Sequence, residues 1–423
     1  MKVLWLINGM TKEIGKLMNF SQSGDIGWIT STLDEMKKQP QIQLYVLFPQ
    51  RLSSELIGLS VDNVTYLGFY QGEKYPWKTN AQVRDIFRDI VGDISPDIIH
   101  IWGTEYAHSL DMIQAINRTE NVVVHIQGLV SVLAKFYMAN LTYFVQHRYT
   151  FRDLMRRSNL RREQINFEKR GKNETYLLKN VHYVMGRTFW DKAHSLEINP
   201  DLQYFHCNES VRPEFFEHEW KLDKAEKYSI FVTQAGYPIK GFHYLLEALT
   251  ILVREFPQVK VRVAGGNPVY EGIKRIRENS YGRYIRRYIE KHNLKQHIEF
   301  IGYQDMDGMI KEYMRANVFV LSSATENSPN SLAEAMVLGV PCVASDVGGI
   351  SSMLRHKEDG LLYQHDDPSI LACYVAELFR NADLSGKLSA SAKASALERY
   401  YVYKNVECLM EIYKGIIEQS GQW

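Results

Sequence analysis

The chain has few cysteines, no excess of charge of either sign and no long uninterrupted apolar run. Its 4 cysteines among 423 residues form no Cys-x-x-Cys pair and show no spacing with histidine that would hold zinc. This pattern argues against a structural zinc and suits a reducing cytosol. The 50 Lys and Arg nearly cancel the 49 Asp and Glu, so no chain-wide basic field indicates nucleic acid as a partner.

The apolar segments are too short or too polar to span a membrane. The opening run, Val3–Asn8, is too brief for a signal-peptide core. The longest apolar tract, 122–145, is interrupted by His125, Gln127, Lys135 and Asn140. A bilayer centre would penalise these polar groups by several kcal/mol in sum. We therefore expect a cytoplasmic protein that is either soluble or peripheral at the inner face of the cell membrane.

Short apolar runs rich in β-branched residues alternate with longer helical patterns along the chain. Such alternation is typical of stacked βαβ units with parallel sheets. Five candidate strands form a first series: Val3–Asn8, Ile42–Phe48, Ile98–Ile101, Val122–Ile126 and Val181–Met185. Five more form a second series: Ser229–Thr233, Val259–Ala264, His297–Ile301, Val318–Leu321 and Pro341–Ala344. The sequence therefore predicts an α/β protein with two parallel sheets.

A polar segment, 207–214, separates the two series. It contains Pro213 and follows neither the helix nor the strand period, so it is the best linker candidate. The chain is also longer than one hydrophobic core usually organises. We predict domains at 1–215 and 216–399. An amphipathic C-terminal helix, about 400–423, can pack back on the first domain or on the second.

One strand–loop–helix segment, residues 318–341, carries two glutamates beside a helix start. Ser328 followed by Pro329 is typical of an N-cap and a first helical residue. This spacing predicts Glu326 in the loop at the carboxyl end of a strand and Glu334 in the first turns of the helix. Open α/β sheets bind their ligands at that edge.

The amino end of this predicted helix offers an anion site. We expect the backbone amides of Asn330, Ser331 and Leu332 to be exposed there, where the helix dipole favours negative charge. A diphosphate fits such a site, with a ribose diol at Glu334 and a hexose hydroxyl at Glu326. Taken alone, the segment also fits a capped surface helix with two solvated glutamates.

A lysine follows the first strand of the second series. The ammonium of Lys240 lies in the turn after that strand, where it can neutralise a departing diphosphate as a point charge. A single lysine in such a turn is more commonly a solvated surface residue. Its significance therefore depends on the two glutamates that accompany it.

Taken together, these landmarks resemble the group 1 family of retaining glycosyltransferases with the GT-B fold, many of which build bacterial envelope polysaccharides and glycolipids. The landmarks occur in the family's order: Lys240-Gly241, Ala264-Gly265-Gly266, the pair Glu326 and Glu334, and the turn Gly348-Gly349. The resemblance covers the second half of the chain. It implies two Rossmann-like domains whose parallel sheets face a central cleft.

The first half resembles the family more loosely. Gly24 and Asp25 lie where the family has a glycine-rich loop facing the donor phosphates, and 96–100 is similar to its PDxxH strand. His125 matches a family histidine that touches the transferred sugar. Without the family, His125 would be interpreted as a histidine with satisfied hydrogen bonds at a strand end.

Three positions depart from the family pattern. Ala235 stands where the family usually carries a phosphate-binding arginine, Asp25 replaces the second glycine of the first loop, and Ser352 stands where a glutamate is common. The missing arginine leaves Lys240 and the helix amides to balance the leaving diphosphate. Either another cation substitutes, for which Arg187 is a candidate, or turnover is slow.

The resemblance implies that a hexosyl group moves from a nucleotide diphosphate sugar to a saccharide or lipid-linked saccharide acceptor, with retention of configuration. The implied catalytic residues are Glu326, Lys240 and His125. The implied donor-binding residues are Glu334, Asn330, Ser331, Leu332, Gly24, Asp25 and Gly265. The nucleotide sugar is a co-substrate, and no cofactor or metal is expected, because Asp305-Met306-Asp307 is interpreted as a solvated turn.

Two other functions were weighed against this one. A catalytically impaired sugar-nucleotide-binding or partner protein with the same fold is the alternative, because of Ala235 and Asp25. A nicotinamide dehydrogenase fits poorly, since no G-x-G-x-x-G follows either leading strand.

Residues 136–172 interleave aromatic and basic side chains. This density suits an interfacial helix on an anionic membrane surface, which a lipid-linked acceptor would explain. It equally suits a long helix that packs its aromatic side chains on the domain and solvates its arginines. The sequence alone does not choose between these two interpretations.

Overall fold

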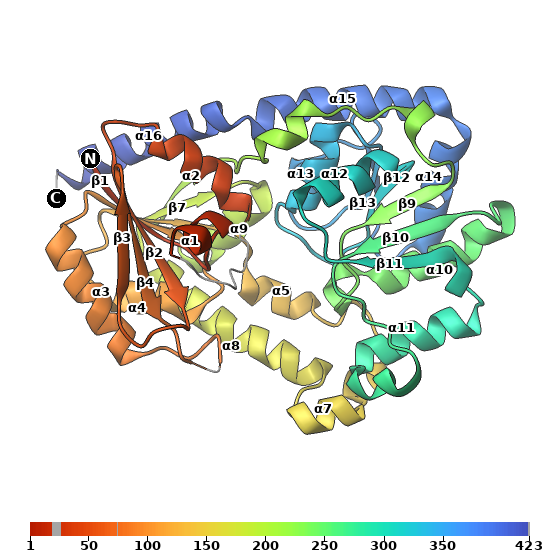
Figure 1. The fold of residues 1–423 in the computed structure, drawn as a ribbon, viewed down its shortest axis with the longest axis horizontal. Helices are drawn as coiled ribbons and strands as arrows, with labels where there is room; N and C mark the ends of the chain where they lie inside the picture. Colours follow the sequence, from red (N-terminus) through yellow and green to blue (C-terminus); the bar gives the residue numbers. More distant parts are fainter. Residues whose placement is uncertain (19–26, 74, 422–423) are drawn as a thin grey trace. The chain divides into compact units, whose positions relative to one another are not determined.

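The computed structural model describes residues 1–18, 27–73 and 75–421 of the chain. The chain forms two compact units, each of which is an α/β unit built on one sheet (Figure 1). The first unit comprises Met1–Val132, Phe167–Pro213 and Arg399–Trp423. The second comprises Leu133–Asn166 and Glu214–Glu398.

Among the described residues, the sheet of the first unit has eight strands in the order β3-β4-β2-β1-β5-β6-β7-β8. The strands are β1 (Lys2–Leu6), β2 (Gln43–Gln50), β3 (Ile57–Val61), β4 (Val64–Tyr70), β5 (Ile98–Trp102), β6 (Val122–His125), β7 (Tyr183–Gly186) and β8 (Gln203–His206). Strand β3 pairs antiparallel with β4, and the other pairs are parallel. The central strands are apolar throughout because helices cover both faces of a parallel sheet.

The side chains of β1 point alternately to two cores of the first unit. Val3 and Trp5 belong to one core, and Leu4 and Leu6 to the other, as expected from the period of two in a strand. The C-terminal helix closes the first core, where the indole Nε1 of Trp5 donates to the hydroxyl of Tyr413 at 2.9 Å. The described helices that lie wholly or partly in this unit are α1 (Lys12–Leu17), η1 (Gly27–Ile29), α2 (Thr30–Lys37), α3 (Ala81–Ile94), α4 (Ala107–Ala115), α5 (Val130–Phe136), α8 (Leu160–Lys179), α9 (Phe189–Ile198) and α16 (Val402–Ser420), with the start of η2 (Pro213–Glu217) and the end of α15 (Ala382–Tyr400).

The described part of the second unit holds a six-stranded parallel sheet in the order β11-β10-β9-β12-β13-β14. The strands are β9 (Ser229–Val232), β10 (Lys260–Ala264), β11 (Ile298–Gly302), β12 (Val318–Leu321), β13 (Cys342–Ser345) and β14 (Leu361–Tyr363). The strand order reverses between β9 and β12. This reversal creates a topological switch point, where a crevice opens at the carboxyl ends of the strands.

Helices and single turns of 3-10 helix connect these strands. They are α6 (Tyr143–His147), α7 (Phe151–Arg156), η2 (Pro213–Glu217), η3 (Leu222–Lys224), η4 (Pro238–Lys240), α10 (Phe242–Glu255), η5 (Gly272–Arg277), α11 (Ser280–Lys291), η6 (Lys295–His297), α12 (Met306–Arg315), α13 (Asn330–Leu338), η7 (Ile350–Ser352), α14 (Pro368–Arg380) and α15 (Ala382–Tyr400).

The predicted fold class is confirmed, since both units are α/β with parallel sheets and every predicted strand is present. The predicted first domain, 1–215, was wrong for residues 133–166, which group with the second unit. Contacts distant in sequence explain this: the carbonyl of Ala139 accepts from the hydroxyl of Tyr244 at 2.7 Å, and the carboxylate of Asp153 accepts from the amide of Ser280 at 2.9 Å. The predicted C-terminal helix, about 400–423, is α16, and residues from Arg399 onward group with the first unit.

Candidate functional site

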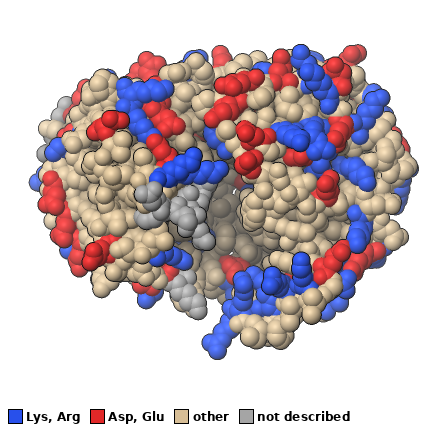
Figure 2. Space-filling view, in the orientation of Figure 1, with Lys and Arg blue, Asp and Glu red and all other residues tan. Residues whose placement is uncertain are grey.

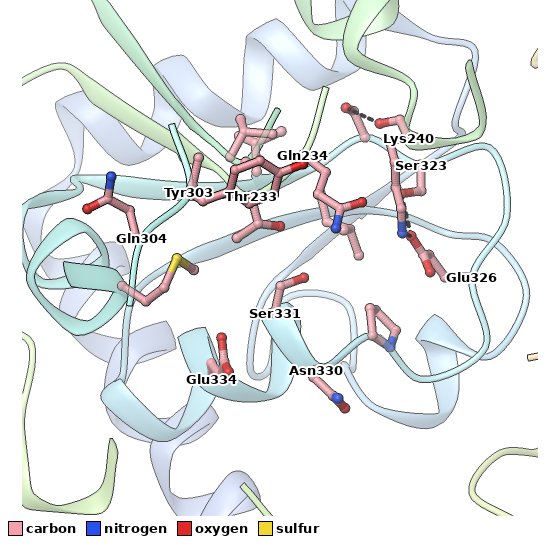
Figure 3. A pocket seen from close by; sticks show the side chains of 18 residues that line it. Thr233, Gln234, Lys240, Tyr303, Gln304, Ser323, Glu326, Asn330, Ser331 and Glu334 are labelled. Atoms are coloured by element: carbon pink, nitrogen blue, oxygen red, sulfur yellow. Dashed lines mark hydrogen bonds and ion pairs between the residues drawn. The ribbon is translucent and has the colours of Figure 1, made fainter. Parts of the chain in front are cut away.

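A pocket of about 350 Å³ opens in the second unit at the switch point of its sheet (Figure 3). The last residues of three neighbouring strands line it: Val232 of β9, Ala264 of β10 and Leu321 of β12. Loops that follow those strands supply its polar side chains. The pocket therefore lies where the crossover pattern of the sheet leaves room for a ligand.

A half-buried ion pair occupies one side of this pocket. The Nζ of Lys240 donates to the Oε1 of Glu326 at 2.6 Å, and the Oγ of Ser323 donates to the same oxygen at 2.7 Å. Burial lowers the pKa of Lys240, but the charge of Glu326 and the hydroxyl of Tyr237 outweigh it, so the pKa is raised overall. Lys240 therefore stays charged, and its bond to the carboxylate is of the strong, charge-assisted kind.

Two glycines allow the loops that carry this ion pair to approach each other. Gly241 has a φ of +64°, and a Cβ added there would lie 1.7 Å from the carbonyl oxygen of Ser322. Gly348 has a φ of +56°, and its Cβ would lie 1.8 Å from the carbonyl oxygen of Glu326. Any other residue would strain the backbone and collide with the facing chain at both positions. Gly241 thus lets the loop of Lys240 approach the loop of Glu326, and Gly348 lets a third loop pack against the backbone of Glu326.

Helix α13 presents its amino end to the same pocket. It begins at Asn330, and Pro329 is the residue before it, with an extended ψ of 124° and no side-chain cap. The prediction of Ser328 as N-cap and Pro329 as first helical residue was wrong by one position, within the usual uncertainty of helix ends. Asn330 and Ser331 line the pocket, as the sequence predicts.

Leu332 differs from its two neighbours on this first turn. Its amide donates to the carbonyl of Pro329 at 3.0 Å, and its side chain is fully buried. The expectation of an exposed Leu332 amide was therefore wrong. The reason is local, because the first turn of α13 closes on itself through an i to i−3 bond.

The second predicted glutamate lies farther along α13. The hydroxyl of Tyr313 lies 3.2 Å from the Oε2 of Glu334 and 2.9 Å from the carbonyl of Ser331. Tyr313 is fully buried, so its hydroxyl holds the carboxylate of Glu334 in place. Figure 3 shows Glu334 and Glu326 on opposite sides of Ser331. The pocket therefore brings together Lys240, both glutamates and the helix start.

Several further pocket residues were not foreseen from the sequence. Thr233 and Gln234 follow β9, Tyr303 and Gln304 follow β11, and Ser323 follows β12. None of these residue types is distinctive. What they share is their position in the sequence, because each follows a parallel strand. The carboxyl ends of such strands meet at one edge of the sheet, so this position could have identified them. Gly265, which follows β10 with a φ of +87°, was predicted and lines the pocket.

Lys240 is the sole cation among the pocket-lining residues in the described part of the chain, against the two carboxylates of Glu326 and Glu334. Ala235, in place of the arginine that the family pattern suggests, is fully buried. The candidate substitute, Arg187, belongs to the first unit, where it is paired with Glu209 and donates to the carbonyl of Gln127 at 2.9 Å. Its guanidinium is therefore already engaged within its own unit.

The predicted site residues of the first unit fall into two groups. Gly24 and Asp25 lie outside the described residues. His125 ends β6 and is buried, with its ring stacked on Trp102 at 4.8 Å and on His100 at 5.7 Å between ring centroids.

Burial holds the pKa of His125 well below its usual range, so the ring is neutral. Among the described residues neither ring nitrogen meets a partner in good hydrogen-bond geometry. The ring is buried, so the contact with a sugar stays a prediction.

The Asp305-Met306-Asp307 segment has a structural role. The Oδ1 of Asp305 accepts from the amide of Gly308 at 2.9 Å and so caps α12. Within the described ranges, no group of three or more His, Cys, Asp or Glu side chains is arranged to hold a metal ion.

No helix of the described chain is both long and apolar enough to cross a membrane.

Comparisons with known proteins agree on the class. Residues 214–395 match the family described as glycosyl transferases group 1. A D-inositol 3-phosphate glycosyltransferase of Corynebacterium urealyticum is 25% identical over 179 residues, which are 42% of this chain and 41% of that protein. The match thus spans less than half of that relative's length.

Solved structures resemble the whole chain. Sucrose-phosphate synthase from Thermosynechococcus elongatus is similar with a TM-score of 0.71 and 15% identity, over 99% of both chains. HepE of Anabaena in complex with UDP-glucose is similar with a TM-score of 0.63 and 15% identity, over 98% of this chain and 100% of that one. The fold is that of the GT-B glycosyltransferases. Within that class, the likeness to the group 1 family rests on residues 214–395, which are less than half of the chain.

Proposed function

We propose that the chain is a metal-independent, retaining glycosyltransferase that moves a hexosyl group from a nucleotide diphosphate sugar to a saccharide or lipid-linked saccharide acceptor. The observation that carries this proposal is the pocket at the switch point of the second unit. There the ammonium of Lys240, the carboxylates of Glu326 and Glu334 and the amino end of α13 line one cavity. A lipid-linked acceptor would bring the chain to the inner face of the cell membrane.

The donor fits this pocket by charge and by hydrogen bonding. The diphosphate would lie against the first turn of α13, where the dipole and the amides of Asn330 and Ser331 favour an anion. Glu334, held by Tyr313, would accept hydrogen bonds from the ribose diol. Glu326 would accept from a hexose hydroxyl on the other side. The solved relative from Anabaena with UDP-glucose bound supports this class of donor.

The ion pair suggests how the leaving group is balanced. Without donor, Lys240 and Glu326 neutralise each other at 2.6 Å. A diphosphate at the helix start would share the ammonium, and Glu326 would keep the hydrogen bond from Ser323 while it accepts one from the sugar. The bond between the anomeric carbon and the diphosphate oxygen breaks, the bond to the acceptor oxygen forms on the same face, and the acceptor proton moves to the diphosphate. The chain then acts by positioning and by charge stabilisation.

Turnover by Lys240→Ala tests the proposal. With UDP-, GDP- and ADP-sugars as a donor panel, the wild-type chain should release nucleoside diphosphate with one of them. Lys240→Ala should lower kcat by about a hundredfold or more, because it removes the sole cation of the described pocket lining. Lys311→Ala, an exposed lysine on α12, is the matched control and should keep wild-type turnover. Near-normal turnover of Lys240→Ala would exclude the assigned role.

A catalytically impaired sugar-nucleotide-binding protein is the second candidate. One cation faces two carboxylates in the pocket lining, and Ala235 supplies no charge. A thermal-shift titration separates binding from chemistry, because a ligand at a hundred times its Kd stabilises by about 2.7 kcal/mol. Stabilisation by a nucleotide sugar without release of nucleoside diphosphate would favour this candidate over the enzyme.

A further inference from the structure

The segment 136–172 is divided in the structure into the end of α5, two short helices and the start of α8. It is therefore not one long helix, and its contact with a membrane surface stays a prediction. Helix α7 is the unusual part. It is held by a capping box in which Thr150 accepts from the amide of Asp153 at 3.1 Å, and Asp153 in turn accepts from the amide of Thr150. Thr150 and Asp153 are both buried.

The apolar side chains of α7 point into solvent. Phe151, Leu154 and Met155 are 56%, 63% and 70% exposed. Their spacing of three and four residues puts them on one face of the helix. An amphipathic helix normally buries such a face and exposes its polar residues. Here Asp153 is buried against the start of α11 instead, so α7 holds its apolar face outward.

A second segment, far away in sequence, repeats this pattern beside α7. In η5, Ile273 and Ile276 are 91% and 54% exposed. Side chains three residues apart eclipse each other in a 3-10 helix, so both lie on one face. Residues of α7 and η5, with Tyr270, line a shared cavity of about 580 Å³. We call these two segments, Phe151–Arg157 and Gly272–Arg277, the α7–η5 surface.

The α7–η5 surface is strongly basic. Its cations are Arg152, Arg156, Arg157, Lys274, Arg275 and Arg277. Among the described residues, no ion pair involves Arg156, Lys274 or Arg277. Figure 2 shows Lys and Arg side chains gathered over the region where Figure 1 draws α7 and α11.

Three further arginines of the second unit extend this basic region. Burial, together with the charges of Arg287 and Arg283, lowers the pKa of Arg148. Arg148 follows α6, and the other two lie on α11, whose first residue is hydrogen bonded to Asp153 of α7. Arginines that lie together and are not paired with acidic side chains favour the binding of an anionic ligand or surface.

We infer that the α7–η5 surface docks the chain on an anionic phospholipid bilayer. A lipid surface satisfies both halves of the pattern, because exposed apolar side chains insert at the headgroup boundary while arginines contact the phosphates. A soluble polyanion would neutralise the arginines but leave Leu154, Met155 and Ile273 in water. This docking goes beyond the transferase proposal and does not depend on it.

Vesicle binding of the full chain tests the inference. The wild-type chain should sediment with phosphatidylcholine–phosphatidylglycerol vesicles and remain in solution with phosphatidylcholine alone. Arg156→Glu with Arg277→Glu should weaken binding about tenfold or more, since each basic side chain contributes to attraction at an anionic surface. Lys224→Glu with Lys387→Glu changes the charge equally at exposed sites of the same unit, and it should bind within about twofold of wild type.

The apolar half of the surface is tested separately. Leu154→Ser with Ile273→Ser should weaken binding to the anionic vesicles about tenfold, because it removes the inserting side chains. Ile370→Ser, an exposed isoleucine on α14, is the matched control and should bind as wild type does. Unchanged binding by the Leu154 and Ile273 variant, or binding to soluble polyphosphate that excludes vesicles, would overturn lipid docking in favour of a soluble polyanion.

A probe at the surface covers the case in which a variant fails to fold. Met155→Trp replaces a side chain that is 70% exposed, so it should leave the fold intact. Its fluorescence should show quenching by brominated lipid in anionic vesicles beyond that of the wild-type chain, and no added quenching would count against insertion. Lys240→Ala should bind vesicles as wild type does, so loss of transfer and loss of docking are distinguishable.

Discussion

The two units follow one plan but differ in what they place at the carboxyl ends of their strands. In the second unit, those ends hold charged groups that are hydrogen bonded to each other, with Lys240 and Glu326 at 2.6 Å. In the first unit, the ends of β5 and β6 hold the stacked rings of Trp102 and His125, and the histidine is kept neutral by burial. The same topology therefore supports a polar, ion-paired pocket in one unit and an aromatic, uncharged surface in the other.

The difference has a physical origin in the backbone. Gly241 lets two loops of the second unit meet closely enough for a lysine and a carboxylate to pair. In the first unit, the strand ends are filled by large rings, which exclude water and penalise charge. A donor with a diphosphate suits the ion-paired environment of the second unit.

The largest expected effect comes from a substitution at Gly241, beside the pocket of the second unit. Gly241→Ala should lower the free energy of unfolding by more than about 3 kcal/mol, because the new Cβ would strain a φ of +64° and collide with the carbonyl of Ser322. Denaturant titration followed by circular dichroism measures this. Gly236→Ala, in the same unit with no atom within 4 Å of its Cβ, should change it by less than about 1 kcal/mol. Equal effects for the two variants would show that close approach of the loops is not required.

The next effect concerns Glu105, a half-buried carboxyl of the first unit. Burial raises the pKa of Glu105 to about 7, although Asn8 donates to its Oε2 at 3.1 Å. An unfolded glutamate titrates near 4.5, so the folded chain holds this proton where the unfolded chain has lost it. Glu105 therefore contributes stability below about pH 4.5, and that contribution is lost as the pH rises through about 7.

A pH series on Glu105→Gln measures this contribution. Relative to Glu105→Gln, the wild-type chain should lose up to about 1.4 kcal/mol of unfolding free energy per pH unit between about pH 5 and 7. Glu55→Gln, at an exposed site of the same unit, should show no such slope relative to wild type. A flat difference for Glu105→Gln would mean that this carboxyl is solvated and that the contrast between the two units is weaker than described.

Local patterns predicted the strands but not all of their partners. The predicted strands are apolar runs bounded by turns. Four strands of the described chain were not predicted: Ile57–Val61, Val64–Tyr70, Gln203–His206 and Leu361–Tyr363. Ile57–Val61 is largely exposed, Gln203–His206 has no fully buried residue, and Leu361–Tyr363 has three residues. The membership of 133–166 in the second unit depends on contacts such as Ala139 with Tyr244, which are more than a hundred positions apart. The hydrophobic periodicity of the sequence does not reveal a contact of that kind.

The site was predictable to the extent that chemistry and position coincide. Lys240, Glu326 and Glu334 are charged and follow strands, so the edge rule for parallel sheets brought them together correctly. Thr233 and Tyr303 occupy equivalent positions without distinctive chemistry, and they were missed. The direct bond between Lys240 and Glu326 was not foreseen either, because it depends on how closely Gly241 lets the two loops approach.

The smallest expected effect sharpens the contrast by separating charge from neutral hydrogen bonding. Ser323→Ala removes the 2.7 Å bond to Glu326 and leaves Lys240 in place. A hydroxyl that donates to a carboxylate contributes about 1.5 kcal/mol, so kcat/KM should fall about tenfold, less than for Lys240→Ala. Ser351→Ala, at an exposed serine of η7, should be neutral. A loss as large as that of Lys240→Ala would mean that the orientation of Glu326, rather than the charge of the ammonium, limits transfer.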